Sequence, residues 1–384
     1  MATSLATTIS DAVSRPIRIC VTCGDPNGVG LEVFLKALLR IASAPDHELR
    51  SPENARIALF APPELLWRYV EMLRRAQPEL LRDNGNVAFS RLPEGGGGFR
   101  IGELVCDVAW NAEIARQTSD GGENSLPQFG EETLEGGCVA FASLRASALA
   151  LRHNEADAVC TMPVSKRALQ MAGFAFPGQT EFYGDAFPSD APPTMILATE
   201  AAALDAERAP VRVGLATVHI PLRQVAAALN SGLIVQRLEA FSASLRQDFG
   251  ASSPRIAVLG LNPHAGEQGI LGEEEQTVIE PAIAEARARG IFAEGAFPAD
   301  GFFARGEYRR FDGILAMYHD QGLIPLKLLA GAGGVNFTAG LSVTRVSPDH
   351  GTAFGIAGRG VADEQSALEA LETAYRVARR RRES

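Results

Sequence analysis

The chain has 384 residues, of which 46% are hydrophobic and 21% charged, a composition typical of a globular protein with one large or two ordinary domains. Its net charge of -10 argues against a nucleic-acid partner, because proteins that bind nucleic acids normally carry a basic surface. No apolar run approaches the roughly 20 residues that a membrane-spanning helix needs. The odd number of cysteines favours a reducing compartment, so we expect a cytoplasmic protein.

From residue 17 onward, short β-branched runs alternate with longer segments of helical pattern. This alternation predicts an α/β protein with a largely parallel sheet. The predicted strands are 17–22, 57–60, 158–161, 194–198, 211–218, 256–260 and 313–317. The predicted helices are 31–41, 63–76, 131–153, 222–229, 233–249, 273–289 and 364–380.

The strand-like run 17–23, which extends one residue past the first predicted strand, contains a Cys-x-x-Cys pair, Cys20 and Cys23. In an extended strand these two positions point to opposite faces, and the sequence has no second pair nearby. We therefore expect two buried core thiols rather than a zinc site.

A glycine-rich segment, 24–30 (Gly-Asp-Pro-Asn-Gly-Val-Gly), follows this strand and precedes a predicted helix. Its spacing matches neither the dinucleotide-binding Gly-x-Gly-x-x-Gly pattern nor a P-loop. Two interpretations stay open. The segment is a loop whose backbone approaches a ligand, or a tight turn in which Asp25 and Asn27 cap the turn or the following helix.

Three segments are expected to be irregular. Residues 1–15 are predicted to form a disordered tail, 93–98 a flexible glycine-rich tip, and 201–210 an Ala-rich surface insertion.

Three of the six histidines, His219, His264 and His319, follow predicted strands. Ligands of open α/β sheets bind at the carboxyl ends of strands, which suggests one shared site. Neutral imidazole is a common ligand of Zn²⁺, and three of them leave a position for water or substrate, as in catalytic sites. Each histidine taken alone fits a structural role better, so the prediction depends on their converging.

Polar side chains gather in the last third of the chain. Lys327, Asn336 and Arg345 could together clamp a phosphate or carboxylate, with the arginine donating as a bidentate fork. The alternative is a set of surface ion pairs. Asp300 follows a turn and is either a proton-relay carboxylate or an ion-pair or helix-capping residue.

Several longer motifs, in the right order along almost the whole chain, resemble the 4-hydroxythreonine-4-phosphate dehydrogenase family of vitamin B6 biosynthesis. The matching segments are 24–30, 176–182 (Phe-Pro-Gly-Gln-Thr-Glu-Phe), 261–267 (Leu-Asn-Pro-His-Ala-Gly-Glu), 318–323 (Tyr-His-Asp-Gln-Gly-Leu) and 347–353 (Ser-Pro-Asp-His-Gly-Thr-Ala).

The resemblance implies an isocitrate/isopropylmalate dehydrogenase-like fold with two α/β/α domains around a cleft. We expect the first domain at 16–175 plus 330–384, and the second at 176–329, carrying metal ligands and dimer contacts. The resemblance also implies an obligate homodimer with its active site at the subunit interface.

The resemblance further assigns roles to individual residues. It implies a divalent metal, Zn²⁺ ahead of Mg²⁺, Co²⁺ or Mn²⁺, on His219, His264 and His319, the last contributed by the partner subunit. The implied substrate contacts are Gln179, Thr180, Lys327, Asn336 and Arg345. NAD or NADP would bind near Asp349, His350 and Gly351, although a structural turn also explains His350.

The implied reaction is NAD-dependent oxidation of 4-phosphohydroxy-L-threonine to 2-amino-3-oxo-4-phosphooxybutanoate, followed by decarboxylation to 3-amino-2-oxopropyl phosphate. The metal would lower the pKa of the substrate hydroxyl and polarise the resulting ketone, which lies β to a carboxylate. Asp300 and Lys327 are the candidates for proton transfer or for orienting ligands.

Two positions depart from the family pattern: Gln179 stands where the family usually has His, and Val346 where Thr is common. Glutamine donates a hydrogen bond but carries no charge and shuttles no proton. A dehydrogenase of a 4-phosphorylated sugar acid, erythronate or threonate 4-phosphate, therefore remains the main alternative. A metal-dependent phosphatase or aldolase and a non-catalytic metal-binding protein are the others.

Overall fold

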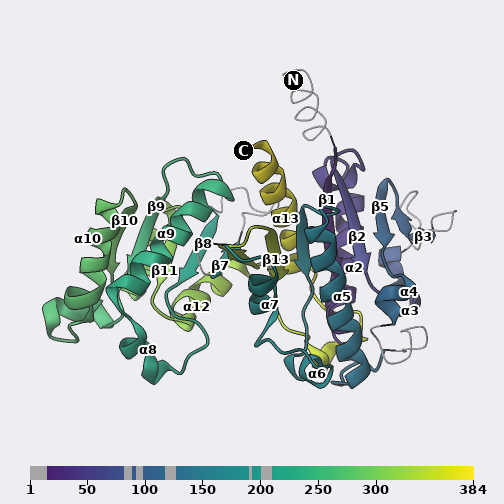
Figure 1. The fold of residues 1–384 in the computed structure, drawn as a ribbon, viewed down its shortest axis with the longest axis horizontal. Coiled ribbons are helices and arrows are strands. Elements are labelled where there is room, and N and C mark those ends of the chain that lie inside the picture. The colour runs from purple at the N-terminus through teal and green to yellow at the C-terminus, as the bar shows by residue number, and fades with distance from the viewer. Residues whose placement is uncertain (1–14, 82–88, 92–97, 117–126, 190–192, 200–209) are drawn as a thin grey trace, which may run out of the picture. The chain divides into compact units, whose positions relative to one another are not determined.

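The computed structural model describes residues 15–81, 89–91, 98–116, 127–189, 193–199 and 210–384 (Figure 1). The chain divides into unit 1, residues 1–188 and 343–384, and unit 2, residues 189–342. We had expected the boundaries after residues 175 and 329. Both boundaries lie further along the chain. α7 (Gln179–Ala186) belongs to unit 1, because its Phe182 packs against Phe141 and Phe174. β12 (Val335–Ala339) belongs to unit 2, because it pairs with β7 (Thr194–Thr199).

The predicted irregular segments lie mostly outside the described residues. Residues 1–14, 92–97 and 201–209 are not described, so the predicted tail, tip and insertion stay predictions. Arg15, at the end of the predicted tail, is described and forms a 2.7 Å ion pair with Asp157.

Unit 1 contains a mixed sheet with the strand order β13-β6-β1-β2-β5-β4-β3. Neighbouring strands from β13 to β5 run parallel, whereas β4 pairs antiparallel with both β5 and β3. Cys20 and Cys23 are free, buried thiols, as predicted. The strands are β1 (Ile17–Thr22), β2 (Ala55–Phe60), β3 (Phe89–Arg91), β4 (Phe99–Ile101), β5 (Leu104–Val108), β6 (Ala158–Thr161) and β13 (Thr344–Pro348).

The helices of unit 1 pack in pairs against this sheet. α5 contacts α6 and strands β1, β2 and β6, while α2 packs against α13. α5 is long and apolar enough to cross a membrane, but two-thirds of its apolar window is buried inside the protein, as in a core helix. The helices are α2 (Gly30–Ser43), α3 (Pro63–Ala76), α4 (Ala112–Ala115), α5 (Leu134–Arg152), α6 (Lys166–Met171), α7 and α13 (Gln365–Glu383), with short 3₁₀ turns η1 (Glu48–Arg50), η2 (Pro78–Leu81) and η6 (Phe354–Ile356).

Unit 2 contains a second set of strands, in the order β10-β9-β11-β8-β7-β12. The strands from β10 to β8 run parallel, and β7 pairs antiparallel with β8 and β12. The parallel strands are β8 (Val211–Leu215), β9 (Arg255–Leu259), β10 (Phe292–Phe297) and β11 (Gly313–Ala316).

The helices of unit 2 cover a core of buried aliphatic and aromatic side chains from β8, β9, β11, α11 and α12. One prediction needs correction: the helix expected at 273–289 is a π-helical turn, η4 (Glu275–Ile279), followed by α10 (Glu280–Ala288). Pro281 has no N–H to donate to the α-helical hydrogen-bond ladder, so the hydrogen-bond pattern changes from π-helical to α-helical next to it. The other helices are α8 (Leu222–Ala228), α9 (Ser231–Gln247), α11 (Ala299–Ala304) and α12 (His319–Ala330), with η3 (Pro263–Gly269) and η5 (Glu307–Arg310) between them.

Candidate active site

Three parallel strands of unit 2 end at one edge of the sheet, and each is followed by a histidine. β8 and β9 both pair in parallel with β11, so the carboxyl ends of the three strands lie together. His219 follows β8, His264 follows β9, and His319 is the first residue of α12. This edge therefore carries all three candidate metal ligands.

The rings of His219 and His319 are neighbours within one chain. Their centroids are 5.8 Å apart and their planes are inclined by 40°. Two imidazoles bound to one Zn²⁺, with Zn–N distances of about 2.0 Å, have centroids about 5 Å apart, so the spacing of this pair is close to that of two ligands of one ion. This pairing within one chain differs from the expected arrangement, in which His319 is contributed by the partner subunit. The two side chains line a cavity of about 280 Å³, formed by residues 217–220, residues 318–320 and Leu222 and Val225 of α8.

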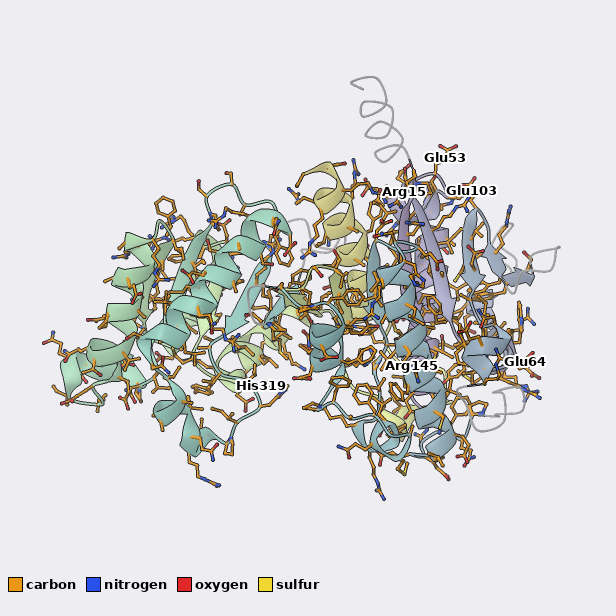
Figure 2. All side chains as sticks on the ribbon, in the orientation of Figure 1. Arg15, Glu53, Glu64, Glu103, Arg145 and His319 are labelled. Carbon is orange, nitrogen blue, oxygen red and sulfur yellow. The ribbon has the colours of Figure 1, made fainter. Side chains whose placement is uncertain are left out.

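A carboxylate orients the ring of His319. Nδ1 of His319 lies 2.7 Å from Oδ1 of Asp320. A proton on Nδ1 shared with this carboxylate leaves the Nε2 lone pair available for a metal. The His319 side chain, labelled in Figure 2, is 40% exposed, so it is open to a ligand from solvent.

The third histidine does not join this pair in a single chain. His264 is not among the residues that line the cavity. Within the described ranges, no three His, Cys, Asp or Glu side chains come close enough to hold one ion. A three-histidine site shared between two copies of the chain stays a prediction.

His264 lies in a turn with left-handed backbone. Its φ is 53°, and φ stays positive through Gln268. A non-glycine residue in this region costs about 1 kcal/mol or more, so other contacts must hold the turn. The buried Glu275 holds one end, because its Oε1 accepts hydrogen bonds from the backbone N–H groups of Leu261 and Asn262, both at 2.7 Å.

The other candidate residues of unit 2 lie on three elements. Asp300 is exposed in the first turn of α11, and Lys327 is exposed in the last turn of α12. Asn336 lies on β12, and its buried Oδ1 has no hydrogen-bond partner among the described residues. A buried acceptor in this state can be completed by a donor from a ligand.

In unit 1, three of the predicted substrate residues meet. Arg345 on β13 is only 3% exposed, and it donates hydrogen bonds to Oε1 of Gln179 at 3.3 Å and to the hydroxyl of Thr180 at 3.4 Å. It also donates to the hydroxyl of Thr161 on β6 at 2.8 Å. Burial lowers the pKa of Arg345 to about 10, so the guanidinium remains charged at neutral pH.

Thr161 was not predicted as a site residue. The available signal was its position as a polar residue at the carboxyl end of a predicted apolar strand, the same signal that singled out the histidines.

The glycine-rich segment forms a tightly packed turn next to the candidate cofactor loop. The backbone N–H of Val29 donates to the carbonyl oxygen of Thr352 at 2.9 Å, and a Cβ on Gly28 would lie 2.8 Å from the same oxygen. Residues 349–351 come just before this contact. There, the backbone N–H of Asp349 donates to Ser366 Oγ at 2.8 Å, and Nδ1 of His350 lies 2.9 Å from the carbonyl oxygen of Gly351.

Asp25 and Asn27 stabilise this turn and not the helix that follows. Oδ1 of Asp25 accepts from the backbone N–H of Asn27 at 2.9 Å, whereas the N-cap of α2 is Val29, which makes no side-chain cap. Asp25 is fully buried, and burial raises its pKa to about 6. Its Oδ2 has no hydrogen-bond partner within the described part of the chain.

Comparisons with known proteins identify the kind of enzyme. Residues 93–374 match the family model of the pyridoxal phosphate biosynthetic protein PdxA. A 4-hydroxythreonine-4-phosphate dehydrogenase of Bacteroides thetaiotaomicron is 38% identical, over 95% of this chain and 90% of that protein. The crystal structure of 4-hydroxythreonine-4-phosphate dehydrogenase from Klebsiella pneumoniae matches with a TM-score of 0.70 and 32% identity, over 94% of this chain and 99% of the Klebsiella chain.

A second similar solved structure is a dehydrogenase named for a different substrate. A terephthalate 1,2-cis-dihydrodiol dehydrogenase from Burkholderia xenovorans has a TM-score of 0.54 at 25% identity, over 94% of this chain and 98% of the other. The chain is therefore an oxidoreductase, in the class of the α/β dehydrogenases. Within that class, it belongs to the PdxA family of pyridoxal phosphate biosynthetic proteins, which confirms the family and the fold class predicted from the sequence.

Proposed function

We propose that the protein oxidises 4-phosphohydroxy-L-threonine with NAD or NADP. The product, 2-amino-3-oxo-4-phosphooxybutanoate, loses CO₂ to give 3-amino-2-oxopropyl phosphate, in the cytoplasmic synthesis of pyridoxal 5'-phosphate. The observation that carries this proposal is the buried guanidinium of Arg345 beside Thr161, Gln179 and Thr180, in a chain whose relatives are named for this substrate.

Such a guanidinium suits an anionic substrate. Taking a cation out of water is costly, and a phosphate or carboxylate that binds it as a bidentate partner offsets that cost. Lys327 would add a second positive charge, and the amide of Asn336 would supply hydrogen bonds. Gln179 and Thr180 would bind the substrate alongside Arg345.

For the metal, we propose His219, His264 and His319 as ligands, with Zn²⁺ favoured by an all-imidazole set. When bound, the ion would lower the pKa of the substrate hydroxyl and polarise the product ketone, and the nicotinamide would supply the hydride acceptor. The chain's own part is to hold these groups in place and move protons. Asp320 fixes the ring of His319, and Asp300 and Lys327 are the proposed proton-transfer residues.

The cofactor would bind beside Asp349, His350 and Gly351. The support for this is their position directly after β13, the strand that carries Arg345, and their packing against the glycine-rich turn through Thr352. A loop at the carboxyl end of a strand offers backbone groups to a ligand.

We further propose that the protein is a homodimer whose active site includes residues of both subunits. Exposed apolar side chains lie on the segments that carry His219 and His319: Ile220 and Leu222 follow His219 and line the cavity, and Ile324 and Leu328 lie on α12. Leu222 is 71% exposed and Leu328 79%. Apolar surface of this kind next to an incomplete site supports a second copy as its cover.

A second candidate function rests on Gln179. Its amide oxygen accepts from Arg345 and, being neutral, does not change charge near neutral pH. A dehydrogenase for erythronate or threonate 4-phosphate would use the same metal, cofactor and Arg345. A phosphatase or aldolase would use the metal and Arg345 without a nicotinamide.

The test is reduction of NAD and NADP by the purified protein, with and without a chelator. The substrates are 4-phosphohydroxy-L-threonine, the two sugar acid phosphates and an aromatic cis-dihydrodiol, and phosphate release is followed in parallel. We expect chelator-sensitive reduction with the phosphorylated hydroxythreonine. Reduction with only a sugar acid phosphate or the dihydrodiol would reassign the substrate, and phosphate release without reduction would rule out the dehydrogenase.

A further inference from the structure

The side chain of Gln321 joins two strands at the edge that carries the histidines. β9 and β11 pair in parallel, with Leu315 opposite Val258 as the last matched residues. Beyond this pair, Oε1 of Gln321 accepts from the backbone N–H of Met317 at 2.7 Å, and its Nε2 donates to the carbonyl oxygen of Gly260 at 2.6 Å. The side-chain amide thus stands where a backbone hydrogen bond would otherwise continue the ladder.

Both ends of this bridge lie on backbone that leads directly to a histidine. Met317 is separated from His319 by Tyr318 alone, and Gly260 begins the segment that leads to His264. The carbonyl group of Met317 is also held, because the hydroxyl of Thr217 donates a 2.7 Å hydrogen bond to its oxygen. The segments after β8, β9 and β11 are therefore tied together through the backbone of Met317 and the side chain of Gln321.

We infer that Gln321 is a positioning residue for the metal ligands, holding both the segment of His264 and the helix of His319 in place on the edge that each subunit presents. This inference rests on the proposed function, since it assumes that these histidines bind a metal. Groups that hydrogen-bond directly to metal ligands typically change metal affinity by about 10- to 100-fold when they are replaced, and Gln321 acts one step further out, through the backbone of Met317 and Gly260.

The side-chain amide meets both demands at this position. The Met317 N–H requires an acceptor and the Gly260 carbonyl requires a donor, and glutamine supplies one of each. A glutamate keeps the acceptor but places a negative charge against the Gly260 carbonyl oxygen. A methionine keeps the length of the side chain and loses both hydrogen bonds.

The experiment is a Co²⁺ titration of the metal-stripped full chain, followed by visible absorption. The variants are Gln321→Glu and Gln321→Met, with His319→Ala as the ligand control. Gln236→Glu, at an exposed position of α9, is matched to the first variant in its change of charge. Amide hydrogen exchange at Met317 reports the bridge itself, and circular dichroism reports folding.

We expect wild-type affinity and spectrum for Gln236→Glu. Both Gln321 variants should bind Co²⁺ about 10- to 100-fold more weakly with an altered spectrum, and should exchange the Met317 amide faster. If His319→Ala loses Co²⁺ while both Gln321 variants keep wild-type affinity and spectrum, the role of Gln321 is overturned and the metal site stands. If the wild-type chain binds no Co²⁺, or His319→Ala binds it unchanged, the proposed metal site and the inference fall together.

Discussion

The guanidinium of Arg345 on β13 donates a 2.8 Å hydrogen bond to the hydroxyl of Thr161 on the neighbouring strand β6. This bond, with those to Gln179 and Thr180, fixes the plane of a buried cation. A lysine would keep the charge but lose the planar fork, so it could not reach all three acceptors.

Replacing Arg345 with Lys should therefore reduce kcat/KM for the phosphorylated substrate by about 10- to 100-fold, mostly through KM, because each lost hydrogen bond of a charged group is worth about 1.5–3 kcal/mol. Arg74→Lys, at an exposed position of α3, is the control and should leave the kinetics unchanged. Steady-state kinetics of the two variants test this prediction. If Arg345→Lys and Arg74→Lys have the same kcat/KM, Arg345 does not bind the substrate.

Asp25 should make the protein less stable as the pH rises. Burial raises its folded-state pKa from 3.8 to about 6, so the folded protein binds this proton more tightly than the unfolded chain does. Its contribution to stability is therefore fully present below about pH 4 and is lost as the pH rises through 6. A shift of this size corresponds to about 3 kcal/mol.

Replacing Asp25 with Asn should remove this pH dependence. Relative to wild type, the free energy of unfolding of the variant should rise by about 2 kcal/mol between pH 4.5 and 7.5, measured by urea denaturation. Asp46→Asn, at an exposed site, should show no such trend. Parallel pH profiles for wild type and Asp25→Asn would contradict the raised pKa.

Long amphipathic helices and buried parallel strands were predictable from the sequence, whereas short strands flanked by glycine were not. The bounds of α3 match the prediction, and β1 and β6 do as well. β12 is a short segment between Gly334 and Gly340, and its sequence alone does not predict a strand. Its extended conformation depends on pairing with β7, which the sequence does not reveal. β10 contains Gly295 and a shift in register, both of which weaken a strand pattern.

The candidate site was predictable in its residue types and in its position at strand ends, but its contacts were not. Long stretches of chain separate the three histidines, so only the pairing of β8, β9 and β11 brings them to one edge. Sequence likewise could not place Thr161 beside Arg345, since the two strands that carry them become neighbours only in the folded sheet.

Glu275 should stabilise unit 2 through the segment that carries His264. Its carboxylate accepts from two backbone N–H groups and, through Oε2, from Nδ2 of Asn262 at 3.0 Å. In Glu275→Gln one acceptor becomes a donor, so a bond is lost and the charge that strengthens the others disappears. We expect a loss of about 1.5–3 kcal/mol of unfolding free energy by urea denaturation, whereas Glu273→Gln, which is exposed, should lose little. Equal losses in both variants would mean that Glu275 does not hold this turn.

Two inactive variants should restore activity to each other if two copies of the chain build each site. We expect His264→Ala and His319→Ala to be inactive alone, because each removes one proposed metal ligand. If these two histidines come from different subunits, a mixed dimer of the variants has one site with both ligands removed and one with all ligands intact. Random pairing makes half of the dimers mixed, so co-expression of the two chains with different tags should recover about a quarter of wild-type activity. His264→Ala mixed with itself is the control for expression and refolding. Purified mixed dimers that remain inactive would show that His264 and His319 act within one chain, and the proposed shared site would be wrong.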